Sequence, residues 1–193
     1  LFGGGFQQLS KEERKRITTN GEPVVELDIK SCHATMAFAH VGIDWYAHSD
    51  EDLYSRLEKD NWPRDVVKKA FNIMMNAKSI KAAIGSLNYE QARSGFLMDS
   101  GMVPFQRWSN DLVQSIQDAY PELEDVFYAE LGNHFMNKEG NICMAIAEWG
   151  MEEQLPILTL HDSFICPADS KARVMDQIGK LFSQVVNSSC VIR

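Results

Sequence analysis

Residues 156–167 read PILTLHDSFICP, and this stretch decides the fold. Two short apolar runs, PILTL and FICP, enclose the polar residues His161, Asp162 and Ser163. Short runs of this kind, separated by a few polar residues, are typical of a β-hairpin. Because Asp162 falls in the turn, the hairpin is expected to carry an acid at its tip.

A second apolar run lies far upstream of the hairpin. Residues 23–28 read PVVELD and predict a strand that also ends in an acid, Asp28. Residues 190–192 predict a short edge strand. Strands that are few and distant in sequence, with helical patterns between them, favour the α+β class: a small antiparallel sheet with helices packed on one face.

Apolar residues at helical spacing predict the helices between and after the strands. The expected ranges are 32–40, 50–59, 64–87 with a break near Asn76, 104–120, 121–131, 137–153 and 170–187. Ser49 followed by Asp52 resembles a capping box at the start of the second range. In the last range, the residues expected to face the core are Met175, Ile178, Leu181 and Phe182.

The composition is that of a soluble globular protein. Of the 193 residues, 45% are hydrophobic and 24% are charged, which is ordinary for one domain or one domain with a small attachment. No apolar run approaches the roughly 20 residues needed to cross a bilayer, so no membrane partner is expected. No signal-peptide pattern is found at the start of the sequence. Because the sequence begins at Leu1 and lacks a starting Met, we expect it to be a segment of a longer protein.

The four cysteines, Cys32, Cys143, Cys166 and Cys190, are scattered and form no CxxC pair. This spacing argues against a zinc site, and a disulfide framework is not expected in a domain of this size. We therefore expect buried free thiols, which fit a cytoplasmic location best.

The formal net charge is −8, with a sequence pI near 5.1. This balance argues against a generic nucleic-acid coat, because phosphate binding usually leaves a basic footprint. The charge is unevenly distributed, however. Residues 64–81 contain five basic residues and one acid, and residues 11–16 contain four basic residues and two acids. The acids elsewhere are expected on solvated surface or among metal ligands.

Asp28 and Asp162 each terminate an apolar strand. If the two strands are neighbours, the carboxylates converge at one sheet edge. Converging carboxylates suit Mg²⁺, which prefers oxygen ligands and keeps positions open for substrate phosphates. Two such ions can hold the attacking and leaving oxygens of a phosphoryl transfer. Taken alone, either acid is more commonly the cap of a strand or a helix.

Arg64, Lys68, Asn72 and Asn76 recur every four residues, so a helix places them along one side. A cationic and polar stripe on an otherwise apolar helix suits a triphosphate, because Arg offers a fork to phosphate and Lys a point charge. The alternative is the solvated face of an amphipathic helix. Phe71 on the same helix is expected in the core, with stacking on a base as the alternative.

Three stretches together resemble family A nucleic-acid polymerases. VVELDIKSCHATMAFA resembles motif A, RDVVKKAFNIMMNA resembles motif B, and ILTLHDSFICPAD resembles motif C, in the order of the family. The resemblance spans about Gly21 to Val186. The triplet His-Asp-Ser is similar to that of bacteriophage-type single-subunit RNA polymerases, and the spacing suggests a compact relative encoded by phages or mobile elements.

The resemblance implies a metal centre and a phosphate-binding helix. Asp28 and Asp162 would hold two Mg²⁺ ions, with Mn²⁺ as a substitute, and the backbone carbonyl of Ile29 would join them. Arg64 and Lys68 would bind the β and γ phosphates of the incoming nucleotide. Lys68 would also protonate or stabilise the departing pyrophosphate. Asn72 and Asn76, which continue the stripe, are assigned to nucleotide binding.

The resemblance also implies contacts with the primer and the template. His161 would orient the primer terminus or support the hairpin, with Ser163 beside it. Asn137 and Glu139 lie where relatives place polar residues that touch the minor groove of the primer–template. The alternative for Asn137 and Glu139 is ordinary chemistry at the start of a helix.

Two positions depart from the family pattern. Motif B normally ends in Tyr-Gly, and here Asn76 and Ala77 stand in those places. Five residues after the motif A acid, DNA polymerases keep a Glu as a steric gate and the RNA polymerases a Gly, whereas this chain has His33. An imidazole could block a 2′-hydroxyl or bind it, and a histidine packed on the sheet is an equal alternative.

The expectation is a single polymerase palm domain over residues 1–193, with 50–103 as a fingers-like helical insertion. The predicted activity is template-directed 5′–3′ DNA synthesis from nucleoside triphosphates on a primer–template. One alternative is a single-subunit RNA polymerase or primase. A second is an inactive nucleic-acid or nucleotide binding module that needs a partner subunit or flanking domains, and the third is an unrelated α+β domain with chance matches.

Overall fold

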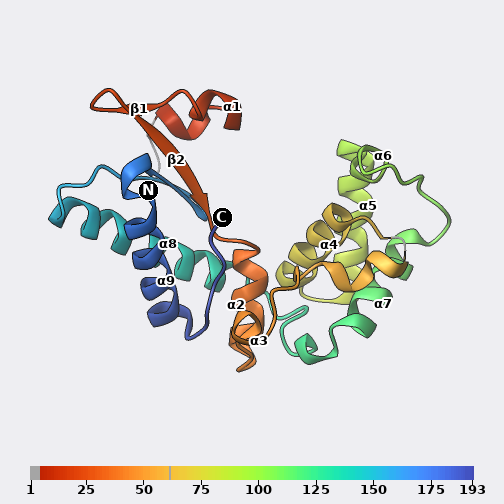
Figure 1. Ribbon diagram of the computed structural model, residues 1–193. Helices are drawn as coiled ribbons and strands as arrows, with labels where there is room; N and C mark the ends of the chain where they lie inside the picture. Colours follow the sequence, from red (N-terminus) through yellow and green to blue (C-terminus); the bar gives the residue numbers. More distant parts are fainter. Residues whose placement is uncertain (1–4, 61) are drawn as a thin grey trace. The chain divides into compact units, whose positions relative to one another are not determined.

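The computed structural model describes residues 5–60 and 62–193 (Figure 1). The chain forms two compact units. The sheet unit comprises the residues up to Cys32, Asp44–Ala47 and Met136–Arg193, and the helical unit comprises His33–Ile43 and His48–Phe135. The structure is of the α+β class, as expected, with a small antiparallel sheet among helices.

The sheet consists of β1 (Thr18–Thr19), β2 (Glu22–Asp28), β3 (Leu158–Leu160) and β4 (Ser163–Pro167). The strand order is β1-β2-β4-β3, and every neighbouring pair is antiparallel. The hairpin predicted from PILTLHDSFICP is β3–β4, which is confirmed. Strand β2 pairs with β4 so that Asp28 lies opposite Ser163 and Leu27 opposite Phe164.

Helix α9 (Lys171–Val186) contacts both β2 and β4 (Figure 1). Its buried residues are Val174, Ile178, Phe182 and Val186, which follow one another every four positions. Ile178 and Phe182 face the core as expected. Met175 and Leu181 are only half-buried, because they lie on either side of this row. The expected inward set was therefore wrong for these two residues.

The sheet unit also contains most of α8 (Gly132–Glu152), which begins five residues before the expected range. A short helix, α1 (Lys11–Arg14), has a complete capping box between Ser10 and Glu13. Arg14 in turn forms an ion pair with Glu26 of β2 at 2.8 Å. The edge strand expected at 190–192 is present as a single bridge between Ile29 and Ile192.

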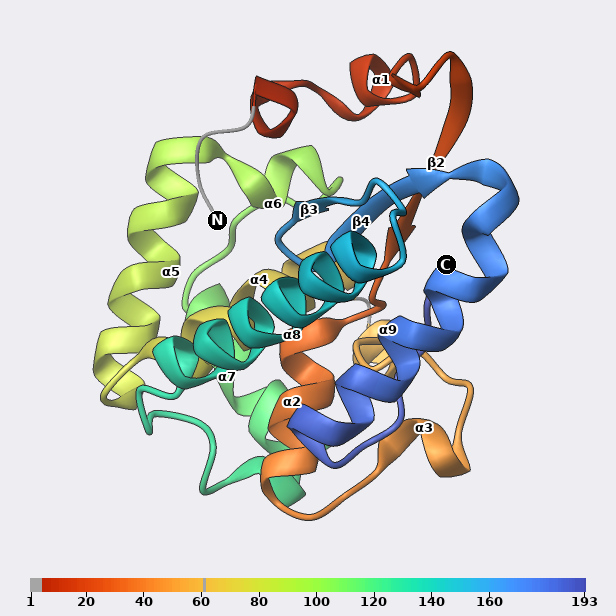
Figure 2. The ribbon, with the colours of Figure 1, turned by 90° about the vertical axis from the view of Figure 1, so that its left-hand side faces the viewer.

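Apart from the first turn of α8, the helical unit contains six helices of four or more described residues, and Figure 2 shows α4, α5 and α7 of this unit. They are α2 (Cys32–His40, from its second residue onward), η2 (Ser55–Asp60), α4 (Arg64–Asn76), α5 (Ile80–Ser94), α6 (Phe96–Asp99) and α7 (Trp108–Ala119). Helices α4, α5 and α7 pack against one another. The predicted break near Asn76 is confirmed, and α5 continues well beyond the expected end at Leu87.

The core of the helical unit is aromatic. Phe71 of α4 is fully buried, and three rings surround it edge-on: Tyr54 at 5.6 Å, Tyr120 at 5.4 Å and Phe127 at 5.2 Å between centroids. The hydroxyl of Tyr120 donates to the carbonyl of Leu53 at 2.7 Å. The core position expected for Phe71 is therefore confirmed.

Three predicted helices differ from the structure. Over 50–59 only the 3-10 helix η2 forms, because Ser49 accepts from the N–H of Glu51 and Asp52 from that of Tyr54. Such two-residue turns compete with helix formation. Over 121–131 a 3-10 turn (Pro121–Leu123) gives way to turns with positive φ at Tyr128 and Glu130. Helix α7 starts at Trp108 rather than Pro104.

Residues 50–103, expected as a fingers-like insertion, lie within the sequence range of the helical unit. None of the described helices is long and apolar enough to span a bilayer.

Candidate functional site

The pairing of β2 with β4 brings the two strand-end acids to the same end of the sheet. Asp28 is the last residue of β2, and Asp162 occupies the turn between β3 and β4. The N–H of Ile29 donates to the carbonyl of Asp162 at 2.9 Å. This backbone bond couples the end of β2 directly to the turn between β3 and β4, so the two acids occupy neighbouring positions.

The carboxylate of Asp28 is held at both oxygens. Its Oδ1 accepts from the hydroxyl of Ser163 at 3.2 Å, and its Oδ2 accepts from Nε of Arg193 at 3.0 Å. The Asp28 side chain keeps 29% of its surface exposed, so a cation can reach it from solvent. Ser163 is itself buried, which makes it a support for Asp28 in this structure. Its expected contact with the primer or the template stays a prediction.

His161 and Glu139, both assigned to the primer–template, lie side by side. The Nδ1 of His161 is 3.7 Å from Oε1 of Glu139, which α8 supplies. His161 has a left-handed backbone (φ 51°), a conformation that histidine adopts more readily than bulky residues do, and its imidazole is largely exposed. Its carbonyl accepts from the thiol of Cys143 at 2.9 Å, which ties the turn to α8. Asn137 lies on the same helix with its side chain exposed.

The pKa values of two buried thiols are affected by the negative charge at this end of the sheet. Burial raises the pKa of Cys32 well above its usual value, and the charges of Asp162 and Glu139 raise it further. Burial likewise raises the pKa of Cys143 to about 12, with Glu139 and Asp162 adding to the shift. Both thiols therefore stay protonated at neutral pH. All four cysteines are free, and three of them are buried, as the sequence predicted, whereas Cys190 is half-buried.

The residues at this end of the sheet suit a hard divalent cation. No group of three or more His, Cys, Asp or Glu side chains that could hold a metal occurs within residues 5–60 and 62–193. A metal here would rely on the carboxylates of Asp28 and Asp162 and the carbonyl of Ile29, with water and phosphate oxygens completing the shell. An all-oxygen set of this kind fits Mg²⁺ or Mn²⁺ and does not fit zinc.

The predicted phosphate ligands lie on α4, in the helical unit. Nη2 of Arg64 is 2.8 Å from Oδ2 of Asp52, and the guanidinium lies 5.3 Å from the centre of the Tyr54 ring. The hydrogen bond to Asp52 raises the pKa of Arg64, so its charge is permanent. Because a guanidinium carries five N–H donors, it can bind a phosphate while keeping Asp52. Lys68, one turn further on, is exposed to solvent.

Asn72 and Asn76 continue the stripe and interact with each other. The side-chain amide of Asn76 donates to the backbone carbonyl of Asn72 at 2.8 Å. A Cβ on Gly132 would fall 1.5 Å from Oδ1 of Asn76, so this conformation of Asn76 requires glycine at position 132. Among the described residues, Oδ1 of Asn72 is buried without a hydrogen-bond partner. A buried acceptor left in this way lowers stability, because the hydrogen bonds to water that it loses on folding are not replaced.

Tyr128, which was not predicted from the sequence, hydrogen-bonds to the last turn of α4. Its N–H donates to the carbonyl of Met74 at 2.9 Å, its φ is 69°, and its buried hydroxyl has no partner among the described residues. A left-handed conformation is a strained one for a tyrosine. No signal in the sequence marks this residue, because the helical pattern of 121–131 hides the turn.

His33, the residue that the resemblance predicts to be a sugar gate, is half-buried near the start of α2. Its ring centroid lies 6.3 Å from that of Phe135, also in the helical unit. A packed histidine and a sugar gate are both compatible with this contact.

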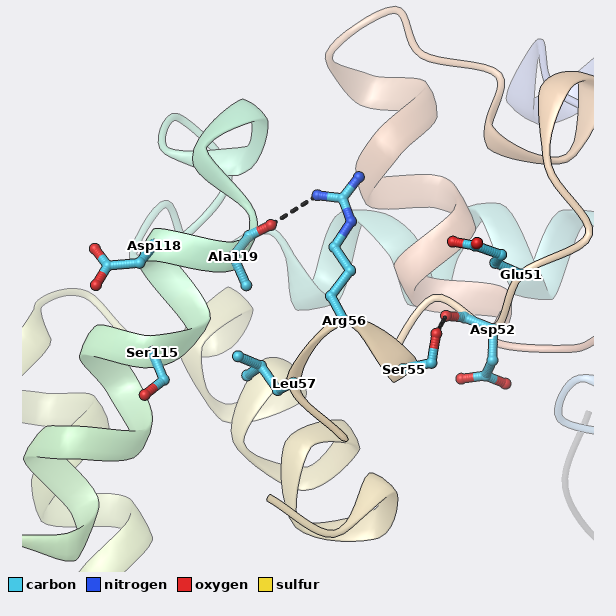
Figure 3. A pocket seen from close by; sticks show the side chains of 8 residues that line it. All are labelled: Glu51, Asp52, Ser55, Arg56, Leu57, Ser115, Asp118 and Ala119. Atoms are coloured by element: carbon cyan, nitrogen blue, oxygen red, sulfur yellow. Dashed lines mark hydrogen bonds between the residues drawn. The ribbon is translucent and has the colours of Figure 1, made fainter. Parts of the chain in front are cut away.

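The helical unit also has an open depression of about 950 Å³ (Figure 3). It is lined by Glu51, Asp52, Ser55, Arg56, Leu57, Ser115, Asp118 and Ala119. The guanidinium of Arg56 donates to the carbonyl of Ala119 at 2.7 Å and pairs with Glu122 at 2.6 Å. Three acids and one already paired cation disfavour a polyanion, so this depression does not suit a triphosphate.

Comparison with models of known protein families finds no match, and a search of curated proteins finds no significant match.

Proposed function

We propose that this chain is a nucleotidyl transferase: a template-directed 5′–3′ DNA polymerase of the family A type. The observation that carries the proposal is the β2–β4 pairing, which sets the strand-end acid Asp28 beside the hairpin-tip acid Asp162. It is supported by the order of the three motifs and by the cationic stripe on α4. The substrates would be a primer–template and nucleoside triphosphates, and the proposed location is the cytoplasm.

Asp28, Asp162 and the carbonyl of Ile29 are the proposed metal ligands. Two bound Mg²⁺ ions would activate the primer 3′-hydroxyl and neutralise charge on the triphosphate. Ser163 fixes one oxygen of Asp28, and the bond from Ile29 to Asp162 fixes the turn, so the ligands are set before substrate arrives. Preorganised ligands of this kind lower the cost of reaching the transition state.

Arg64 and Lys68 are the proposed ligands of the β and γ phosphates. Asp52 and Tyr54 hold Arg64 in one place. Lys68 is exposed, so its ammonium group can contact the phosphates of a bound nucleotide. Lys68 would also give a proton to the departing pyrophosphate.

Replacing Lys68 by alanine is expected to weaken binding of a nucleoside triphosphate by about 10- to 100-fold, since a charge-assisted hydrogen bond contributes about 1.5–3 kcal/mol. Calorimetric titration with the nucleotide measures the change. Lys69→Ala is the matched control, because Nζ of Lys69 is already engaged by Glu90 at 3.1 Å. Equal affinities for the Lys68 and Lys69 variants would contradict the assignment.

The sugar of the product separates the DNA polymerase from its runner-up, a single-subunit RNA polymerase or primase. A side chain bulkier than glycine at position 33 favours deoxynucleotides, whereas Ser163 resembles the RNA branch. Replacing His33 by glycine is expected to raise ribonucleotide use relative to deoxynucleotide use by about tenfold or more, as removal of a steric gate does. Incorporation of each class in separate reactions measures the ratio, and an unchanged ratio would assign His33 to packing.

The second candidate function is a nucleotide-binding module without turnover, dependent on a partner subunit or flanking domains. The net charge of −8 favours it, because a duplex-binding surface is normally basic. Mg²⁺-dependent nucleotide binding without incorporation would identify this function.

A further inference from the structure

The segment Ser188–Arg193 runs along the proposed metal-ligand strand. The N–H of Lys30 donates to the carbonyl of Val191 at 2.8 Å. Asp28 and Arg193 exchange two backbone bonds: the N–H of Asp28 donates to Arg193 at 2.9 Å, and that of Arg193 donates back at 3.1 Å. Arg193 is therefore fixed directly opposite Asp28.

A second anchor holds the other end of this segment. The carboxylate of Asp44 accepts from the N–H of Ser189 at 3.0 Å and from its hydroxyl at 3.0 Å. The same carboxylate accepts from the hydroxyl of Ser188 at 3.0 Å. Anchored at both ends, the segment presents its arginine to Asp28 as part of the fold.

The guanidinium of Arg193 occupies the side of Asp28 that Ser163 leaves open. Its Nε lies 3.0 Å from Oδ2, while Ser163 binds Oδ1. A divalent cation at Oδ2 would be repelled by a guanidinium in this place. The Arg193 side chain is 61% exposed, so it can move into water at little cost, as surface ion pairs generally do.

We propose that Arg193 is a built-in counter-ion of the metal centre that competes with divalent cations for Asp28. It neutralises the carboxylate and holds it in place before a metal binds, and the metal then displaces it. This inference rests on the metal ligands assigned under the proposed function. It adds a residue that no polymerase motif in the chain contains.

The affinity of the full chain for Mn²⁺ tests the proposal without requiring turnover. Electron paramagnetic resonance measures this affinity, because it reports the concentration of the unbound ion. Arg193→Ala is expected to bind Mn²⁺ up to about fivefold more tightly than the unmodified chain, the range set by the strength of exposed ion pairs. The gain should shrink as ionic strength rises, because salt screens the pair it removes. Arg173→Ala is the matched control, since Arg173 is an exposed arginine of the same unit that pairs with Glu153.

Equal or weaker Mn²⁺ affinity in Arg193→Ala, with Arg173→Ala unchanged, would overturn the counter-ion role. The Asp28→Asn variant separates a failure of the role of Arg193 from a failure of the metal assignment. If Asp28→Asn loses Mn²⁺ while Arg193→Ala changes nothing, only the role of Arg193 fails. If Asp28→Asn binds Mn²⁺ as the unmodified chain does, the metal assignment fails and the role of Arg193 falls with it. Circular dichroism of each variant confirms that the fold is retained.

Discussion

Replacing Asp28 by asparagine is expected to lower the rate of nucleotide incorporation by about 10³-fold or more, which corresponds to about 4 kcal/mol of transition-state stabilisation. Asparagine keeps the size of the side chain and an oxygen that can accept from Ser163. It removes the negative charge that a divalent cation needs. Single-turnover incorporation at saturating nucleotide measures the loss, and Asp162→Asn is expected to behave in the same way.

The matched control for this prediction is Glu22→Gln, which removes one negative charge from the exposed start of the same strand. Its incorporation rate should stay within about twofold of the unmodified chain, because a distant surface charge is screened by salt. Thermal unfolding of each variant verifies that the sheet is intact. An Asp28→Asn variant that is folded and fully active would remove Asp28 from the chemistry.

Replacing Phe71 by alanine is expected to lower the free energy of unfolding by about 3–5 kcal/mol. The ring is fully buried, and it makes edge-on contacts with Tyr54, Tyr120 and Phe127. Deleting it leaves a cavity in the helical unit and removes three aromatic contacts. Urea denaturation, followed by far-ultraviolet circular dichroism, measures the change.

The control for Phe71 is Tyr89→Ala, since Tyr89 on α5 is 66% exposed. Its unfolding free energy should change by less than about 0.5 kcal/mol, as is usual for surface substitutions. The pair also tests the alternative that Phe71 stacks on a base. That alternative predicts weakened nucleotide binding with normal stability, the reverse of the outcome expected here.

The hairpin β3–β4 and most of β2 could be predicted from the sequence because these stretches are largely apolar, whereas the two-residue strand β1 (Thr18–Thr19) was not predicted. In 163–167 four of the five residues are buried, so no alternation was needed to recognise a strand. The acids at the strand ends were visible for the same reason: each interrupts an apolar run. The pairing of Asp28 with Ser163 then follows from the antiparallel register.

The rest of the site depends on contacts between residues far apart in sequence. Arg193 and Asp28 are 165 positions apart in the sequence, and the local pattern around either residue does not indicate that they pair. The turns at 49–54 were missed because side-chain acceptors capture backbone N–H groups that a helix would otherwise use. Tyr128 was missed because its N–H donates to the carbonyl of Met74, a contact between residues far apart in sequence that no local pattern indicates.

The position where the sequence departs from the motif B that it resembles has a structural counterpart. Asn76 stands where the family A polymerases that the sequence resembles keep a tyrosine, and its amide donates back to the carbonyl of Asn72. Gly132 leaves room for this side chain. Position 76 is therefore filled by a small polar group packed against its own helix. Under the proposed function, an aromatic contact with the nascent base pair would have to come from another residue.

The most direct test of the central claim is extension of a labelled primer–template by the purified chain, with deoxynucleotides and ribonucleotides in separate reactions. The proposed two-acid metal centre predicts extension that requires Mg²⁺, proceeds better with deoxynucleotides and disappears in Asp162→Ala. A folded chain that extends the primer with neither class of nucleotide, or an Asp162→Ala variant that still extends it, would contradict the claim.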